Sequence, residues 1–238
     1  QLSSSVTVCV IMFFTVRWRP KLCFSVKRIG PLFSFGWKML ISNLINTLYS
    51  ELRTLIIGKK FSADTLGYYN KGYQFPQLLM LCVDGTLNSV LLPAYASSQE
   101  NLEKLKNMMR RSMKTSTFLV FPAMTALAVM GKPLISLLLT DKWLPCVPFL
   151  QIFCFVFAFY PLHTANLQAI KAIGRSDIFL KLEIIKEIIG LAVLLVSVFC
   201  FDDVMAIAIA AALTAPIGII INSFPNKKLL DYSLLNQL

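Results

Sequence analysis

Charged residues are scarce in this sequence. Asp, Glu, Lys and Arg make up 15% of its 238 residues, while apolar types make up 56%. A soluble domain usually carries roughly 25% charged residues. The shortage of charge therefore argues against a water-soluble globule and favours a chain that lies in a membrane.

Sequence motifs for catalysis and for cofactor binding are also lacking. We find no nucleophile elbow, Walker loop, GxGxxG turn or CxxC pair, and the sequence holds a single histidine, His163. The six cysteines are isolated, mostly in apolar runs, which is typical of small core residues rather than of a zinc site or a disulfide framework. We therefore expect neither an enzyme nor a metal ion or other cofactor.

Long apolar runs are plentiful. A membrane helix needs about 20 mostly apolar residues. Seven stretches approach or exceed that length: 2–16, 32–57, 74–96, 115–131, 144–170, 179–201 and 204–224. The sequence thus predicts an all-α polytopic membrane protein, a bundle of about six complete transmembrane helices plus one truncated helix.

Basic residues alternate between successive connections. The first, third, fifth and seventh connections hold 17 of the 23 Lys and Arg residues, and the other three hold 5. Cytoplasmic loops of membrane proteins are rich in Lys and Arg, so we place the 17-residue side in the cytoplasm. A nucleic-acid-binding protein of net charge +11 would show no such alternation, and no nucleic-acid partner is expected.

The expected organisation follows from these runs. It comprises a truncated transmembrane helix (1–16), a cytoplasmic loop (17–31), a six-helix bundle (32–224) and a cytoplasmic tail leading to a missing C-terminal part (225–238). We expect external connections at 58–73, 132–143 and 202–203. Residues 99–112 are amphipathic, which predicts a separate short helix on the cytoplasmic face.

One run carries polar residues in helical register. A single stripe about 22 Å long is formed by Lys38, Ser42, Asn46, either Tyr49 or Ser50, and Arg53 if residues 32–57 are helical. A polar stripe of that length should face protein or water rather than lipid. It predicts either the wall of a hydrated cavity or a packed helix interface with hydrogen bonds, and the two cations favour the cavity.

The next run places a carboxylate near mid-membrane. Asp84 has Asn88 one turn further on the same face, and Asp84 could serve cation coupling, act as counter-charge to Arg53 or Lys38, or be a neutral hydrogen-bonded residue. Glu51 could also take part in ion coupling or simply reach the outer interface.

Other polar residues within the runs have weaker interpretations. We expect His163 to be a structural hydrogen-bonding residue near a kink at Pro161. Lys186 and Glu187 could line a cavity, but snorkelling to the cytoplasmic surface is favoured slightly. Pro122 and Pro216 should kink or locally break their helices.

Several stretches resemble the polysaccharide transporter family, the O-antigen and exopolysaccharide repeat-unit flippases of the multidrug/oligosaccharidyl-lipid/polysaccharide flippase superfamily. They are 32–40 (LFSFGWKML), 44–61 (LINTLYSELRTLIIGKKF), 66–76 (LGYYNKGYQFP), 141–152 (DKWLPCVPFLQI) and 160–190 (YPLHTANLQAIKAIGRSDIFLKLEIIKEIIG). Such flippases have two bundles of six helices around a central cavity. The resemblance implies that this chain is a fragment comparable to the C-terminal bundle, whose partner would be the missing N-terminal bundle of the same protein.

The resemblance implies a function at the bacterial inner membrane. The cargo would be an undecaprenyl-diphosphate-linked oligosaccharide, moved by alternating access, with membrane lipid and polysaccharide assembly machinery as further partners. From depth and spacing, Lys38 and Arg53 could shield the diphosphate, and Asn43, Asn46 and Asn88 could meet sugar hydroxyls. Two alternatives stay open: a cation-coupled drug antiporter of the same superfamily, and a membrane-embedded polysaccharide polymerase or ligase.

Overall fold

The structure is a computed structural model that describes residues 2–15, 26–201 and 203–230. Every regular element in that part of the chain is a helix, which confirms the predicted all-α class. The chain divides into two compact units, Gln1–Ser34 and Phe35–Leu238. The first unit contains α1 (Leu2–Thr15) and the start of α2.

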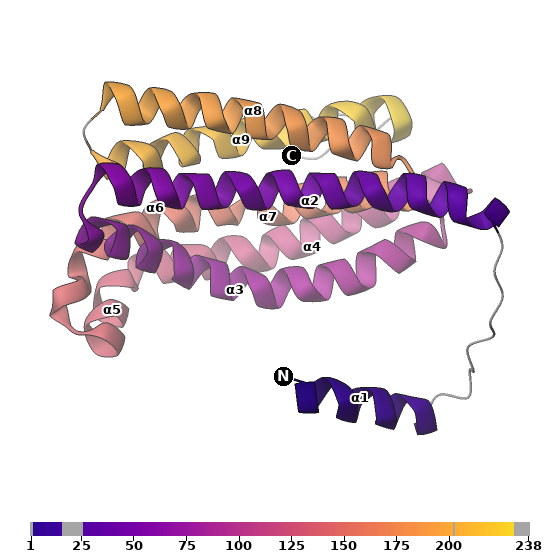
Figure 1. The fold of residues 1–238 in the computed structure, drawn as a ribbon, viewed down its shortest axis with the longest axis horizontal. Coiled ribbons are helices and arrows are strands. Elements are labelled where there is room, and N and C mark those ends of the chain that lie inside the picture. Colours follow the sequence, from indigo (N-terminus) through magenta and orange to yellow (C-terminus); the bar gives the residue numbers. More distant parts are fainter. Residues whose placement is uncertain (1, 16–25, 202, 231–238) are drawn as a thin grey trace. The chain divides into compact units, whose positions relative to one another are not determined.

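The second unit is built from long helices that run roughly along one direction (Figure 1). The helices after α1 are α2 (Val26–Lys60), α3 (Ala63–Ala96), α4 (Leu102–Val129), α5 (Gly131–Leu139), the 3-10 turn Asp141–Cys146, α6 (Val147–Ala158), α7 (Tyr160–Ala172), α8 (Ser176–Cys200) and α9 (Val204–Leu230).

Four of these segments are long and apolar enough to cross a membrane: Ala63–Ala96, Leu102–Val129, Asp141–Ala172 and Val204–Asn226. Helices α2 and α8 have 35 and 25 residues, which is also a spanning length, but they carry more charge. These findings confirm a polytopic membrane protein. The charges within α2 and α8 require that their polar faces meet protein or water.

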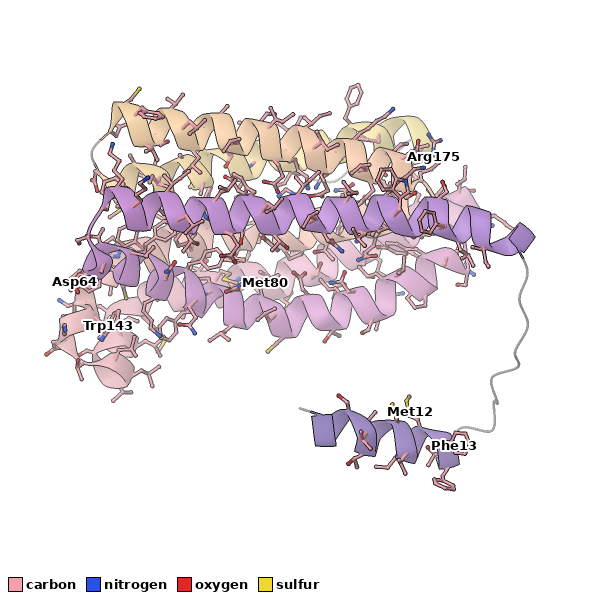
Figure 2. All side chains as sticks on the ribbon, viewed as in Figure 1. Met12, Phe13, Asp64, Met80, Trp143 and Arg175 are labelled. Carbon is pink, nitrogen blue, oxygen red and sulfur yellow. The ribbon has the colours of Figure 1, made fainter. Side chains whose placement is uncertain are left out.

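The two ends of the second unit carry the connections expected on opposite sides of the membrane. Asp64 and Trp143, from the second and fourth connections, lie together at one end, and Arg175, from the fifth, lies at the other (Figure 2). This separation agrees with the alternation of basic residues along the sequence.

Three predicted connections contain more helix than expected. The loop predicted over residues 58–73 is helical except near Ser62, because α2 ends at Lys60 and α3 begins at Ala63. The Ser62 hydroxyl accepts a hydrogen bond from the Thr65 backbone N–H at 3.2 Å and so caps α3. Of the loop predicted over 17–31, residues 17–25 lie outside the described residues, and α2 begins at Val26. The connection predicted over 132–143 is mostly helical, with α5 to Leu139 and a 3-10 turn from Asp141.

The separate amphipathic helix predicted over residues 99–112 is also wrong. The segment is the beginning of α4, which continues without interruption to Val129. The Asn101 side chain caps this helix by accepting a hydrogen bond from the Lys104 backbone N–H at 2.9 Å. The basic residues of this connection are therefore carried on a rigid helix instead of a loop.

A helix break lies beside one proline but not at two others. Helices α4 and α9 continue through Pro122 and Pro216. The span 144–170 is broken at Phe159, between α6 and α7, and Pro161, where a kink was expected, lies in the first turn of α7. Proline is tolerated there because the first-turn N–H groups have no partner within the helix.

The core around α6 is aromatic. The Tyr69 and Tyr73 rings of α3 meet the Phe153 ring edge to face, at centroid separations of 5.2 and 5.1 Å. Phe149 packs against the Tyr69 ring at 5.8 Å. Such pairs hold α3 against α6 through apolar contacts and the ring quadrupoles.

A glycine allows this contact to be close. A Cβ atom on Gly72 would lie 2.5 Å from Phe149 Cβ and 2.8 Å from the Leu150 backbone N, so α3 and α6 could not keep their separation. We expect Gly72→Ala to destabilise the protein by about 3 kcal/mol through overpacking, measured by thermal unfolding in detergent.

Gly85→Ala is the matched control on the same helix, because nothing lies within 4 Å of its added Cβ. Alanine favours helix over glycine by about 1 kcal/mol, so this variant should be as stable as the parent or slightly more so. Equal unfolding temperatures for the two variants would contradict the close packing at Gly72.

Candidate functional site

A cavity of about 340 Å³ lies among helices of the second unit, mainly α2, α7, α8 and α9. Its wall has both charged and aromatic members. The lining side chains with charge or hydrogen-bonding capacity include Asn46, Tyr49, Arg53, Tyr73, Tyr160, His163, Glu183, Lys186 and Glu187. The charges come from α2 and α8, the two helices too polar to resemble simple membrane spans.

Arg53 reaches the cavity from the second half of α2. Its guanidinium carbon lies 5.3 Å from the centre of the Tyr73 ring and 5.9 Å from that of Tyr69. Its Nε atom is buried and has no hydrogen-bond partner among the described residues. A cation held by aromatic faces keeps donor capacity for a ligand.

The opposite charges are paired on α8. The Lys186 Nζ atom donates to Glu183 Oε1 at 2.6 Å, and the Asn46 amide donates weakly to Glu183 Oε2 at 3.5 Å. Glu183 is 4% exposed, so its charge is compensated by these two contacts rather than by bulk water. The pair joins α8 to the polar stripe of α2.

Lys186 and Glu187 both line the cavity. The preference for snorkelling at these positions was therefore wrong. The physical reason is that α8 packs beside α2 and α9, so that this face of the helix turns toward protein. With Arg53 and Glu183, the cavity holds two cations and two carboxylates.

His163 lines the cavity from α7 and is fixed by α9. Its Nδ1 atom is 2.9 Å from the Asn222 amide nitrogen. A Cβ atom on Gly218 would lie only 2.8 Å from His163 Cε1, so glycine is needed for this close approach. The structural hydrogen bond predicted for His163 is present.

The polar stripe of α2 divides into two parts. Asn46, Tyr49 and Arg53 line the cavity. Ser42 is buried, and its hydroxyl donates within the helix to the Lys38 carbonyl at 2.8 Å. The second half of the stripe thus forms part of the cavity wall, and the first half, with Lys38 and Ser42, lies outside that wall.

The remaining predicted site residues lie elsewhere. Lys38, Glu51, Asp84 and Asn88 are not among the residues that line this cavity. Glu51 is exposed, consistent with its two-residue offset from Arg53 on the helix.

Asp84 and Asn88 instead join α3 to α7. The Thr164 hydroxyl donates to Asp84 Oδ1 at 2.9 Å, and the Gln168 amide donates to Asn88 Oδ1. No ion pair links Asp84 to a cation among the described residues. Of the alternatives considered for Asp84, the hydrogen-bonded residue matches this geometry.

A second pair of bonds joins α7 to α9. Besides His163 and Asn222, the Asn226 amide donates to Asn166 Oδ1 at 2.6 Å. Both asparagines are fully buried. Helix α7 is therefore hydrogen-bonded on one side to α3 and on the other to α9.

Sequence reasoning included Tyr49 in the polar stripe but missed the other tyrosines of the wall. Tyr73 and Tyr160 line the cavity, but in or beside an apolar run a tyrosine has the same pattern as a core residue. Gly190 of α8 allows the close approach of Tyr49, since a Cβ there would lie 2.9 Å from the Tyr49 hydroxyl. Tyrosine rings beside charged groups offer apolar faces and hydroxyl donors, a combination suited to a ligand with sugar and phosphate groups.

The sequence of this chain is similar to those of several known proteins. The chain is 28% identical over 169 residues to the lipopolysaccharide biosynthesis protein WzxC of Escherichia coli, covering 71% of this chain and 34% of that protein. It is 26% identical over 177 residues to the teichuronic acid biosynthesis protein TuaB of Bacillus subtilis, covering 74% and 37%. The probable lipid II flippase MurJ of Rhizobium meliloti is 32% identical over 126 residues, covering 50% and 22%.

The chain spans about a third of the length of the curated relatives TuaB and WzxC. No solved structure matches it. Its apolar helices and these relatives identify a multi-pass protein of the bacterial inner membrane. Residues 1–148, more than half of the chain, match the family described as polysaccharide biosynthesis protein, and the chain belongs to that family.

Proposed function

We propose that this chain forms part of a flippase that moves undecaprenyl-diphosphate-linked oligosaccharide repeat units across the inner membrane for O-antigen or exopolysaccharide biosynthesis. The observation that carries the proposal is the cavity with Arg53, Lys186, Glu183 and Glu187 in its wall, among helices of membrane-spanning length. The relatives named for lipopolysaccharide biosynthesis and as a lipid II flippase support it.

The chemistry of the cavity suits such a cargo. A diphosphate cannot cross hydrocarbon unaided, so cations in a hydrated cavity are needed to replace its water shell. Arg53 supplies a planar fork for phosphate oxygens, and Lys186 becomes available when its contact with Glu183 opens. Asn46, retained from the sequence prediction, and His163 can bond sugar hydroxyls.

The other residues predicted from the sequence have different places in the proposal. Lys38 and Asn88 lie outside the cavity wall and are assigned no cargo contact in this conformation. Ion coupling by Asp84 and Glu51 stays a prediction. The protein acts as a transporter rather than an enzyme, together with a second bundle and with polysaccharide assembly machinery.

Filling the cavity provides the test. Thr214 lines it from α9, and a tryptophan there would occupy a large part of about 340 Å³. With Thr214→Trp at the chromosomal locus, we expect surface polysaccharide to fall at least about tenfold at normal protein levels. Surface polysaccharide is measured by immunoblot and protein level in isolated membranes.

Leu213→Trp is the matched control, because Leu213 is 67% exposed and faces away from the bundle. It should export normally. In the Thr214→Trp strain, lipid-linked repeat units should accumulate in the inner leaflet, protected in spheroplasts from an impermeant oxidant. Accumulation in the outer leaflet would instead indicate a polymerase or ligase, and normal export with Thr214→Trp would refute the cavity as the transport route.

A further inference from the structure

The first turns of α4 carry cations that the cavity does not use. Arg110, Arg111 and Lys114 are all exposed. Spacings of three and four residues put Arg110 and Arg111 on the same side of the helix as Lys114. We call these three residues the basic face of α4.

The opposite side of the same turns is fixed to the protein. Leu105, Met109 and Met113 are at most 2% exposed and pack in a core cluster with Tyr95 of α3. The Tyr95 hydroxyl and the Ser112 hydroxyl are hydrogen-bonded to each other. The basic face is therefore held in one orientation, unlike charges on a loop.

Large exposed apolar side chains follow the basic face along α4. Phe118 and Leu119, one turn beyond Lys114, are 83% and 63% exposed. Along the helix axis, Phe118 lies about 6 Å from Lys114 and about 10 Å from Arg111. The headgroup layer is about 5 to 8 Å thick on each side of the hydrocarbon, so the long side chains of the basic face reach the depth of the lipid phosphates.

Nothing within the described part of the chain neutralises these cations. The ion pairs there join Arg175 to Asp177 and Lys186 to Glu183, and neither includes a residue of α4. The only acidic residue of α4 is Glu103, in its first turn. Three fixed, unpaired cations beside exposed apolar residues complement a surface of anionic headgroups.

We propose that the basic face of α4 binds the headgroups of anionic phospholipids in the bilayer. Lys114 and Arg111 contact the phosphates directly, with Arg110 adding charge on the flanking side, while Phe118 lies against the acyl chains. The basic face is exposed on the bundle and is separate from the cavity. The proposal therefore does not depend on the transport function.

Native mass spectrometry of the whole protein in a neutral detergent tests this site, with phosphatidylglycerol as the probe and phosphatidylcholine as the neutral comparison. The variant Arg110→Gln/Arg111→Gln/Lys114→Gln should weaken phosphatidylglycerol binding at least about tenfold. Binding of phosphatidylcholine should not change.

The matched control is Lys59→Gln/Lys132→Gln/Lys142→Gln, which removes three exposed cations outside α4. It should alter phosphatidylglycerol binding less than about twofold. An equal loss in both triple variants, or retained binding in the α4 variant, would overturn the proposal. So would a preference for undecaprenyl diphosphate over phosphatidylglycerol above tenfold, because the face would then belong to the cargo.

Thermal unfolding of both triple variants shows whether they are folded. If the α4 triple variant does not fold, Arg111→Gln and Lys114→Gln are measured singly. Each should weaken phosphatidylglycerol binding about threefold, and unchanged binding in both would refute the site.

Discussion

Arg53→Ala at the chromosomal locus is expected to lower polysaccharide export about 100-fold while leaving normal amounts of protein in the membrane. The guanidinium lies beside the Tyr73 and Tyr69 rings in the cavity wall. Alanine removes the only arginine that the described residues contribute to that wall, and with it the planar donor for the diphosphate. Export is measured as surface polysaccharide per unit of protein.

Three companion variants show whether the effect is specific to the cavity. Arg53→Lys should restore part of the export, because charge matters more than bidentate geometry for a cargo that must also leave. Lys38→Ala should cause a smaller loss, since Lys38 lies outside the wall. Lys59→Ala, an exposed cation at the end of the same helix, should have no effect. Normal export with Arg53→Ala would show that Arg53 serves packing alone.

Lys186→Met should destabilise the protein strongly, because it leaves the buried carboxylate of Glu183 without its cation. Glu183 is 4% exposed and lies 2.6 Å from Lys186 Nζ. Breaking one side of a buried pair costs about 3 to 5 kcal/mol, which corresponds to a fall of about 10 °C in unfolding temperature for a chain of this size. Thermal unfolding in detergent measures it.

The double variant Glu183→Gln/Lys186→Met should recover most of that loss, since it removes the uncompensated charge. Lys181→Met is the matched control, an exposed lysine on the same helix. If the double variant is as unstable as Lys186→Met alone, the effect comes from packing and the pair contributes little.

The long helices could be predicted from the sequence, because each has enough consecutive apolar residues to fill a membrane or a core, whereas the short α5 lies in a predicted connection. Their ends could not be located as well. Ser62 and Asn101 lie among polar residues that resemble a loop, and only the cap hydrogen bonds to Thr65 and Lys104 fix where α3 and α4 begin. Local patterns of polarity do not show whether a polar segment continues as a helix.

The cavity was predictable in part. A single helix showed the stripe through Asn46 and Arg53, since residues three or four apart share a face. Glu183 and Lys186 lie on α8. Glu183, which Asn46 contacts, is 137 positions further along the sequence, and no spacing rule connects two helices so far apart. The partner of Asp84 could not be identified for the same reason, since Thr164 is 80 positions away.

The hydrogen bonds of α7 have a mechanical consequence. Asp84 with Thr164 and Asn88 with Gln168 have the same sequence offset, so α3 and α7 run parallel and are matched turn by turn. Two further bonds match α7 to α9 in the same manner.

Sliding α7 by one helical turn, about 5.4 Å, would break all four of these bonds together. The three helices therefore resist shear as one stiff plate.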